Sequence, residues 1–214
     1  MRAAVPKQYL PLLGRPLIHH TLERLSAHPR VRGIVLGLAA DDDQWSARPA
    51  TSEKLLGTFI GGAVRAQTVL NGLKTLSAHA KPGDWVMVHD AVRPCVRRED
   101  IDNLIARATA NPDGGLLGLP VSNTIKRVDA SQHVLTTVSR ADLWNAMTPQ
   151  IFRIGQLQAA LTQSLAQALD VTDEASAIEA AGGRPVIVPG HPDNIKITIP
   201  EDLALAEMFL RHQG

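Results

Sequence analysis

The segment HDAVRP at residues 89–94 carries the side chains with the clearest capacity for chemistry. It follows an apolar run, VMV at 86–88, that is typical of a buried parallel strand, so its polar residues fall in the loop at the strand's C-terminal end. Open α/β sheets bind ligands at that end of their strands. There the Asp90 carboxylate could hold a divalent cation, and the Arg93 guanidinium could bind phosphate through two hydrogen bonds. Taken alone, the segment could equally be a solvated Asp–Arg surface pair.

Three further segments have residue types that suit a phosphate or nucleotide site. Lys7 follows a proline in a loop before the first predicted helix, where an ammonium group could neutralise a polyphosphate. The glycine pair at 61–62 precedes a helix, and backbone N–H groups at such a junction can contact a nucleotide, although a plain strand-to-helix turn explains the glycines equally well. Lys196 lies inside a predicted strand, NIKIT, where a charge is costly unless it faces a site or solvent.

Thr148, in MTPQ, and Thr172, in VTDEASA, lie at loop ends. Thr172 could instead serve only as the N-cap of the helix that follows it. The single cysteine, Cys95, excludes an intramolecular disulfide and is best explained as a small, half-buried apolar residue.

Composition places the chain among globular proteins. With 214 residues it is long enough to bury a full core, and we expect one domain over residues 1–214. The net charge of +1 argues against nucleic acid as a partner. No apolar stretch approaches the length of a membrane span and no signal-peptide pattern is present, so we expect no membrane association and a cytoplasmic location.

Apolar runs alternate with amphipathic segments along most of the chain. This pattern predicts an α/β fold with a mostly parallel sheet and right-handed crossovers. We expect strands at 32–39, 58–62, 84–89, 114–121, 185–189 and 194–198, and helices at 16–28, 63–79, 98–110, 155–169, 173–181 and from Pro200 onward.

Residues 122–144 break the alternation. Two short β-prone runs, 124–128 and 134–138, flank the sequence DASQH, which predicts an inserted β-hairpin. An isolated two-stranded hairpin is marginally stable in water. The hairpin must therefore fold back on its own domain or reach another subunit as an arm.

The order of motifs along nearly the whole chain resembles that of 2-C-methyl-D-erythritol 4-phosphate cytidylyltransferases. Many separate motifs in order make this resemblance far more specific than a lone glycine motif. The segments that carry it are PKQYL, HPRV, GGAVRAQTVLNGL, VHDAVRP, PVSNTIKR, TVSRADLW, TPQIF, TDEASA and DNIKITIPEDLALAE.

The resemblance implies a Rossmann-like, three-layer nucleotidyltransferase fold whose β-arm at 122–144 contributes to a homodimer. It also implies Mg²⁺-dependent transfer of CMP from CTP to a sugar-alcohol phosphate, with release of pyrophosphate, in the non-mevalonate synthesis of isoprenoid precursors. By motif, Lys7 would stabilise the transition state, and Lys196 and Arg140 would hold the acceptor phosphate. Asp90 would bind Mg²⁺ and the acceptor, whose pocket would be lined by Arg93, Thr124, Thr148 and Thr172. The cytidine would be contacted by Gly62, Ala63, Thr68 and Ala91.

The sequence departs from the family pattern in three ways. Ala63 stands where the family commonly has Asp, so a side-chain contact there must be replaced by backbone, and TVSR replaces the common TVDR. The family also has a strand and a loop of the type VPAAGxGxRM before PKQ, whereas the printed sequence begins MRAAVPKQ. We expect a misassigned start codon or a truncation here, rather than a divergent protein that cannot bind CTP normally. Without that first strand, we expect neighbouring strands to be left with unpaired backbone groups.

Two alternatives to this function stay open at the level of sequence. The acceptor could be another sugar-alcohol phosphate, such as ribitol 5-phosphate. The chain could also be a non-catalytic dimer that lacks the phosphate loop.

Overall fold

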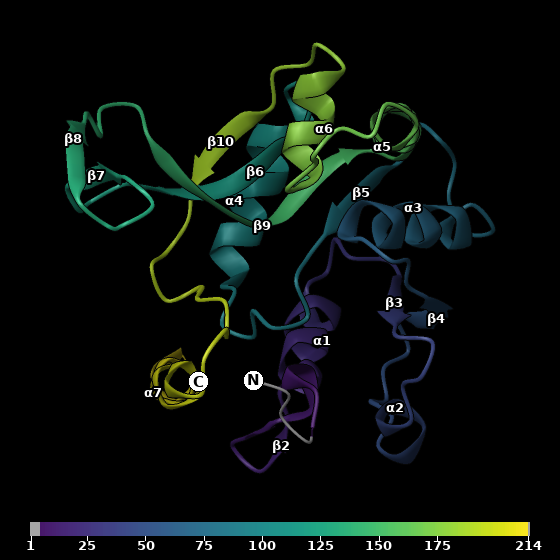
Figure 1. Cartoon of the computed structure of the whole chain (residues 1–214). Helices are drawn as coiled ribbons and strands as arrows, with labels where there is room; N and C mark the ends of the chain where they lie inside the picture. The colour runs from purple at the N-terminus through teal and green to yellow at the C-terminus, as the bar shows by residue number, and fades with distance from the viewer. Residues whose placement is uncertain (1–4, 214) are drawn as a thin grey trace.

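The computed structural model describes residues 5–213, and Figure 1 shows the arrangement of their helices and strands. The helices are α1 (Leu17–Ala27), α2 (Gln44–Ala47), α3 (Arg65–Leu76), α4 (Arg98–Thr109), α5 (Ile154–Ala166), α6 (Glu174–Ala180) and α7 (Glu201–Gln213), and a short 3₁₀ turn, η1 (Lys7–Tyr9), precedes them. The strands are β1 (Pro11–Leu12), β2 (Arg15–Pro16), β3 (Ile34–Leu38), β4 (Leu55–Ile60), β5 (Trp85–Val88), β6 (Gly115–Pro120), β7 (Ile125–Val128), β8 (Val134–Val138), β9 (Trp144–Arg153) and β10 (Val186–Pro189).

A four-stranded sheet in the order β10-β6-β9-β5 forms the middle layer. β10 runs parallel to β6, while β9 is antiparallel to both β6 and β5, so three of the four strands share one direction. Apolar side chains of α3, α5 and α6 pack on one face, and those of α4 pack on the other. The sheet with helices on both faces matches the predicted three-layer α/β fold.

Strands β3 and β4 form a separate parallel pair. Within residues 5–213, β3 bonds only to β4, and β5 bonds only to β9, so each has one edge without a strand partner. A cavity of about 770 Å³ is lined by both of these strands, including Ile34 and Val35 of β3 and residues 85–87 of β5. The expectation of neighbouring strands with unpaired edges agrees with this arrangement. Residues 1–4, at the start of the segment MRAAVPKQ on which that expectation rests, lie outside the described residues.

The structure differs from the sequence-based predictions most clearly at β9 and at residues 194–198, and the short elements β1, β2 and α2 were not predicted either. β9 was not predicted, because its ten residues contain Pro149 and lack an alternating apolar pattern. Conversely, residues 194–198 were predicted as a strand and form none: Ile197 donates to the Val92 carbonyl at 3.0 Å, but no ladder continues from that bond. A single backbone hydrogen bond does not make a strand pair.

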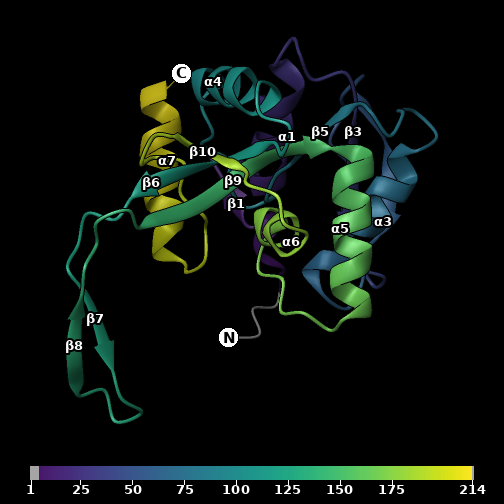
Figure 2. The same cartoon turned by 90° about the horizontal axis from the view of Figure 1, so that it is seen from above.

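The predicted hairpin is present as β7 and β8, which pair antiparallel and project from the body of the molecule (Figure 2). Val128, Val134 and Leu135 on this arm are exposed. Across residues 5–213, no helix has the length and apolar character needed to cross a membrane.

Candidate active site

Asp90 lies just after β5, among three positively charged side chains that come from different parts of the chain. Lys196 Nζ is 3.0 Å from Oδ2, Arg93 Nε is 3.5 Å from the same oxygen, and Arg65 Nη2 is 3.4 Å from Oδ1. Burial alone would raise the pKa of Asp90, but Lys196 first, and then Arg65 and Arg93, outweigh burial and leave the pKa lowered. Asp90 is therefore ionised in a strongly positive environment. The structure brings together Asp90, Arg93 and Lys196, three of the residues that the resemblance implies for the site.

Arg65 and Glu174 belong to this cluster and were missed from the sequence. Arg65 is the first residue of α3, and both of its Nη groups bond to the Glu174 carboxylate, which is buried. These residues are 109 positions apart, so no local pattern joins them. A signal did exist, because Arg65 lies inside the motif GGAVRAQT and Glu174 inside TDEASA.

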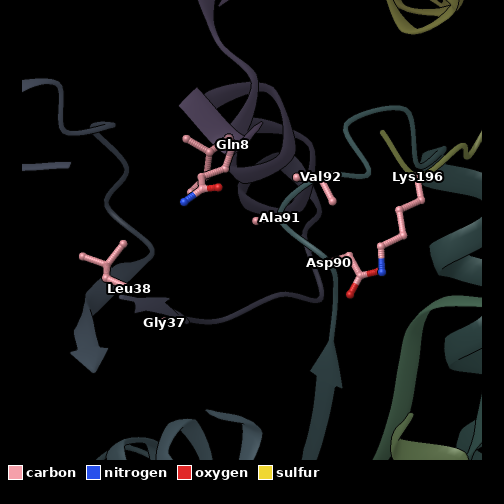
Figure 3. Close-up of a pocket in the computed structure, with 8 residues that line it drawn as sticks. Gln8, Gly37, Leu38, Asp90, Ala91, Val92 and Lys196 are labelled. Atoms are coloured by element: carbon pink, nitrogen blue, oxygen red, sulfur yellow. The ribbon is translucent and has the colours of Figure 1, made fainter. Parts of the chain in front are cut away.

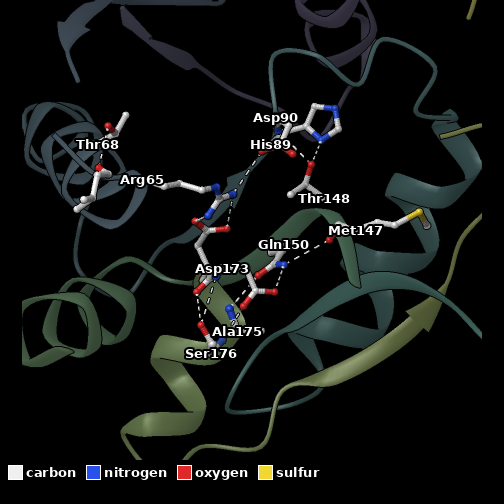
Figure 4. Close-up of polar contacts among 12 residues, drawn as sticks. Arg65, Thr68, His89, Asp90, Met147, Thr148, Gln150, Asp173, Ala175 and Ser176 are labelled. Carbon is white, nitrogen blue, oxygen red and sulfur yellow. Dashed lines mark hydrogen bonds and ion pairs between the residues drawn. The ribbon is translucent and has the colours of Figure 1, made fainter. Parts of the chain in front are cut away.

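His89 and Thr148 fix the backbone beside the carboxylate (Figure 4). The Thr148 hydroxyl accepts a hydrogen bond from the Asp90 N–H at 3.0 Å and lies 3.0 Å from His89 Nδ1, while His89 Nε2 lies 3.0 Å from the Arg93 carbonyl. Burial lowers the pKa of His89 to about 4, so its ring is neutral at pH 7. Thr148 of β9, which the resemblance implies for the acceptor pocket, therefore lies beside Asp90 and supports it through the main chain.

A pocket of about 170 Å³ lies at the ends of β3 and β5 (Figure 3). Asp90, Ala91 and Lys196 line it together with Gln8 and the β3 residues 37–38. Lys7 precedes Gln8 in the chain, and its side chain is exposed. It donates to the Thr198 carbonyl at 2.6 Å, which connects η1 to the segment that carries Lys196. Gln8 and the end of β3 were not predicted as site residues.

The residues expected to contact a nucleotide fall on two parts of the chain, the glycine turn with the start of α3 and the turn after β5. The Gly62 N–H donates to Thr68 Oγ1 at 2.9 Å, which ties the glycine turn to the first turn of α3, and Ala63 between them is exposed. The Ala91 carbonyl accepts from Thr21 Oγ1 at 2.8 Å, which fixes the opposite turn on α1. A helix start with free N–H groups is a suitable environment for an anion.

Arg140, Thr124 and Thr172, which the resemblance implies around the acceptor, make no hydrogen bond or ion pair with the described residues of the Asp90 cluster. Arg140 donates to the carbonyl of Ser122 at the base of the arm, and Thr124 is exposed on the same arm. Thr172 is exposed before α6, and the N-cap of that helix is Asp173, not Thr172: the Asp173 carboxylate accepts from the Ser176 N–H in a capping box. Asp is as good an N-cap as Thr and is one residue closer to the helix.

The side chains around Asp90 determine which ligands a divalent cation could find at this site. Residues 5–213 contain no group of three or more His, Cys, Asp or Glu side chains that could hold a metal alone. Mg²⁺ in nucleotide enzymes is usually held by one or two carboxylates together with substrate phosphates. Asp90 Oδ1, with one partner at 3.4 Å, suits that shared type of site.

An α/β sheet that gathers carboxylate, guanidinium and ammonium groups at the ends of its strands is suited to positioning phosphates. The class that this fold and site define is the nucleotidyltransferases. The model of the IspD family, 2-C-methyl-D-erythritol 4-phosphate cytidylyltransferase, matches residues 1–212. The chain belongs to this family.

Comparisons with individual proteins agree. The chain is 50% identical over 209 residues to the 2-C-methyl-D-erythritol 4-phosphate cytidylyltransferase of Hahella chejuensis. This alignment covers 96% of this chain and 86% of the relative. It is 46% identical to that of Tolumonas auensis, over 100% of this chain and 92% of the relative. The crystal structure of the Francisella tularensis enzyme superposes with a TM-score of 0.85 at 33% identity, over 96% of this chain and 93% of that one.

Proposed function

We propose that the chain transfers CMP from CTP to 2-C-methyl-D-erythritol 4-phosphate, giving 4-diphosphocytidyl-2-C-methyl-D-erythritol and pyrophosphate. Membership of the family supports the reaction. The observation that carries the proposal within the structure is the Asp90 carboxylate, held among Lys196, Arg93 and Arg65 at the ends of the strands.

The chemistry requires positioning and charge neutralisation. A phosphate oxygen of the acceptor attacks the α-phosphorus of CTP; the new P–O bond forms as the bond to the β-phosphate oxygen breaks, and pyrophosphate leaves with that electron pair. Because the attacking phosphate is already anionic, no general base is needed. Fixed cations that stabilise charge in the transition state then supply most of the catalysis.

Each predicted side chain has a role in this scheme. Lys7 neutralises the triphosphate, Lys196 and Arg140 hold the acceptor phosphate, and the pocket for the acceptor is completed by Arg93, Thr124, Thr148 and Thr172. The turns at Gly62, Ala63, Thr68 and Ala91 contact the cytidine. The pocket beside Asp90 supports this division, because it is lined both by Lys196, one of the phosphate-binding cations, and by Ala91, on one of the nucleotide turns.

Mg²⁺ is the proposed cofactor, and Asp90 is the protein ligand that would hold it together with nucleotide phosphates. When bound, it would neutralise phosphate charge and orient the triphosphate. The protein side chains hold the Asp90 carboxylate ionised and oriented for that task, because the three cations around it lower its pKa.

We also propose a homodimer formed through the arm at 122–144. The exposed apolar residues Val128, Val134 and Leu135 support it, because an unpacked hairpin with apolar side chains is marginal in water. A cytoplasmic location, expected from the sequence, is proposed as well; cell fractionation would test it.

Asp90→Asn tests the proposal. The substitution keeps the size of the side chain but removes its charge and replaces one acceptor oxygen with an NH2 donor. We therefore expect pyrophosphate release from CTP and the acceptor with Mg²⁺ to fall at least about 100-fold. Asp170→Asn, at an exposed loop position, is the matched control and should keep full activity. Near-normal turnover of Asp90→Asn, with an unchanged melting temperature, would remove Asp90 from the mechanism. The same assay with ribitol 5-phosphate in place of the erythritol phosphate tests the acceptor.

A further inference from the structure

Glu174 is a buried carboxylate beside the site to which the reaction above gives no role. Only 1% of its side chain is exposed, and both of its oxygens bond to Arg65, with Nη2 at 3.0 Å from Oε2. Burial raises the pKa of Glu174, and the ion pair with Arg65 opposes that rise. A buried charge is costly unless it is paired, so the pair persists only because both groups are held in place.

The Glu174 end of this pair is fixed by its surroundings. Glu174 is the first residue of α6, whose capping box is formed by Asp173 and Ser176. Gln150 of β9 donates to the Asp173 carboxylate at 2.9 Å and accepts from the Ala175 N–H at 2.8 Å (Figure 4). The backbone of Glu174 is thereby held through its two neighbours in the chain, which fixes the point from which its carboxylate reaches Arg65.

Arg65 is the movable partner. Its side chain is long and 33% exposed, and it reaches Asp90 Oδ1 at 3.4 Å. Charge-assisted N–H···O contacts between such groups are normally about 2.7–2.9 Å, so the Arg65–Asp90 contact is stretched while the contact with Glu174 is close. Arg65 is therefore held back from Asp90 by Glu174.

We propose that Glu174 is a positioning residue: it restrains the Arg65 guanidinium so that Asp90 Oδ1 stays accessible to the divalent cation. This inference rests on the proposed function, which gives Asp90 that cation. In the cluster, two carboxylates face the three cations Arg65, Arg93 and Lys196. Without the Glu174 charge, three cations face Asp90 alone, and Arg65 is free to close on it as a two-point ion pair that competes with the metal.

The test compares Glu174→Gln, Arg65→Gln and the double variant. Mn²⁺ is the probe, and its binding is measured by electron paramagnetic resonance in the presence of CTP, independently of turnover. Glu174→Gln should weaken Mn²⁺ binding about tenfold, because the released Arg65 occupies Asp90. The double variant should bind Mn²⁺ at least as tightly as the unmodified chain, because the competing cation is gone. A purely structural role predicts a lower melting temperature with no such reversal.

Two controls separate the possible outcomes. Glu179→Gln changes an exposed carboxylate on the same helix and should leave Mn²⁺ binding unchanged. Asp90→Asn should abolish the binding. If Asp90→Asn abolishes it and Glu174→Gln does not weaken it, the positioning role is wrong and the proposed function stands; if Asp90→Asn has no effect, both fail. Should Glu174→Gln not fold, Arg65→Gln alone decides, since weaker Mn²⁺ binding by that variant would overturn the proposal.

Discussion

His89 precedes the central carboxylate and is held in a neutral form by its surroundings. Its two ring nitrogens lie 3.0 Å from the Thr148 hydroxyl and from the Arg93 carbonyl. One nitrogen must donate to the carbonyl, so the other can accept from the threonine hydroxyl. This single residue thus connects the start and the end of the loop that carries Asp90.

The buried imidazole gives the protein an acid sensitivity that can be assigned to one residue. In the unfolded chain His89 takes up a proton near pH 6.5, whereas in the folded chain it stays neutral down to about pH 4. Within that interval the unfolded state binds more protons, so the free energy of unfolding decreases as the pH falls. We expect His89 to account for a decrease of up to about 3 kcal/mol between these pH values.

Urea unfolding at pH 7 and at pH 4.5 measures this effect. His89→Gln should be less stable than the unmodified chain at pH 7, because the contact with Thr148 is altered, but should lose less stability on acidification. His79→Gln, which changes an exposed histidine, is the control and should keep the original pH dependence. Equal slopes for the unmodified chain and His89→Gln would contradict the assignment.

Side chains with their own chemistry could be predicted from the sequence, whereas their counter-ions could not. Asp90 and Arg93 share one short loop, and Lys196 stood out as a charge in an apolar segment. Glu174 looks locally like an ordinary acidic residue in the first turn of a helix, where the helix dipole favours it. Only the packing of α3, α5 and α6 into one core cluster brings it to Arg65, and packing between distant segments is not encoded in a local pattern.

At the scale of elements, the alternation of strands and helices was predictable because it rests on apolar periodicity. The helices α1, α3, α4, α5 and α6 all lie within the predicted ranges or one residue from them. The strand β9 was not predictable in this way, since WNAMTPQIFR has neither a period of two nor a continuous apolar run. Its place in the sheet depends on pairing with β5 and β6, which are distant in sequence.

The arm leads to a test of the shared active site. Arg140 and Thr124 lie on the projecting hairpin, while Asp90, Arg93 and Lys196 lie in the body of the chain. If the arm reaches a second copy, each site takes Asp90 from one subunit and Arg140 from the other. Mixing Asp90→Asn with Arg140→Ala should then restore activity, to at most half per heterodimer, because one site of the mixed dimer has both defects and the other has neither.

Pyrophosphate release after subunit exchange measures this complementation, and each variant alone serves as the inactive control. Heterodimer formation is verified with differently tagged chains. Absence of recovery in a verified heterodimer would mean that the arm serves the site of its own subunit.

At the scale of the whole molecule, the four-stranded sheet and the β3–β4 pair are joined through helices. Leu36 of β3 packs with Ile18 and Leu22 of α1, while Val86 of β5 packs in the core under α3 and α5. Between the two sheets lies the cavity described above. The contact between the β3–β4 pair and the four-stranded sheet therefore depends on side-chain packing, and within residues 5–213 no strand-to-strand hydrogen bonds connect the two.

The open edge of β3 has a consequence for the exchange of its amide protons with solvent. The Ile34 N–H donates to Lys54 beside β4, and successive residues of a strand direct their amides to opposite sides. The amides of Val35 and Gly37 therefore face the side without a strand partner, whereas the amide of Leu36 faces β4. Hydrogen exchange followed by NMR should show fast exchange at Val35 and Gly37 and slow exchange at Leu36, and uniform protection along β3 would mean that another segment covers this edge in solution.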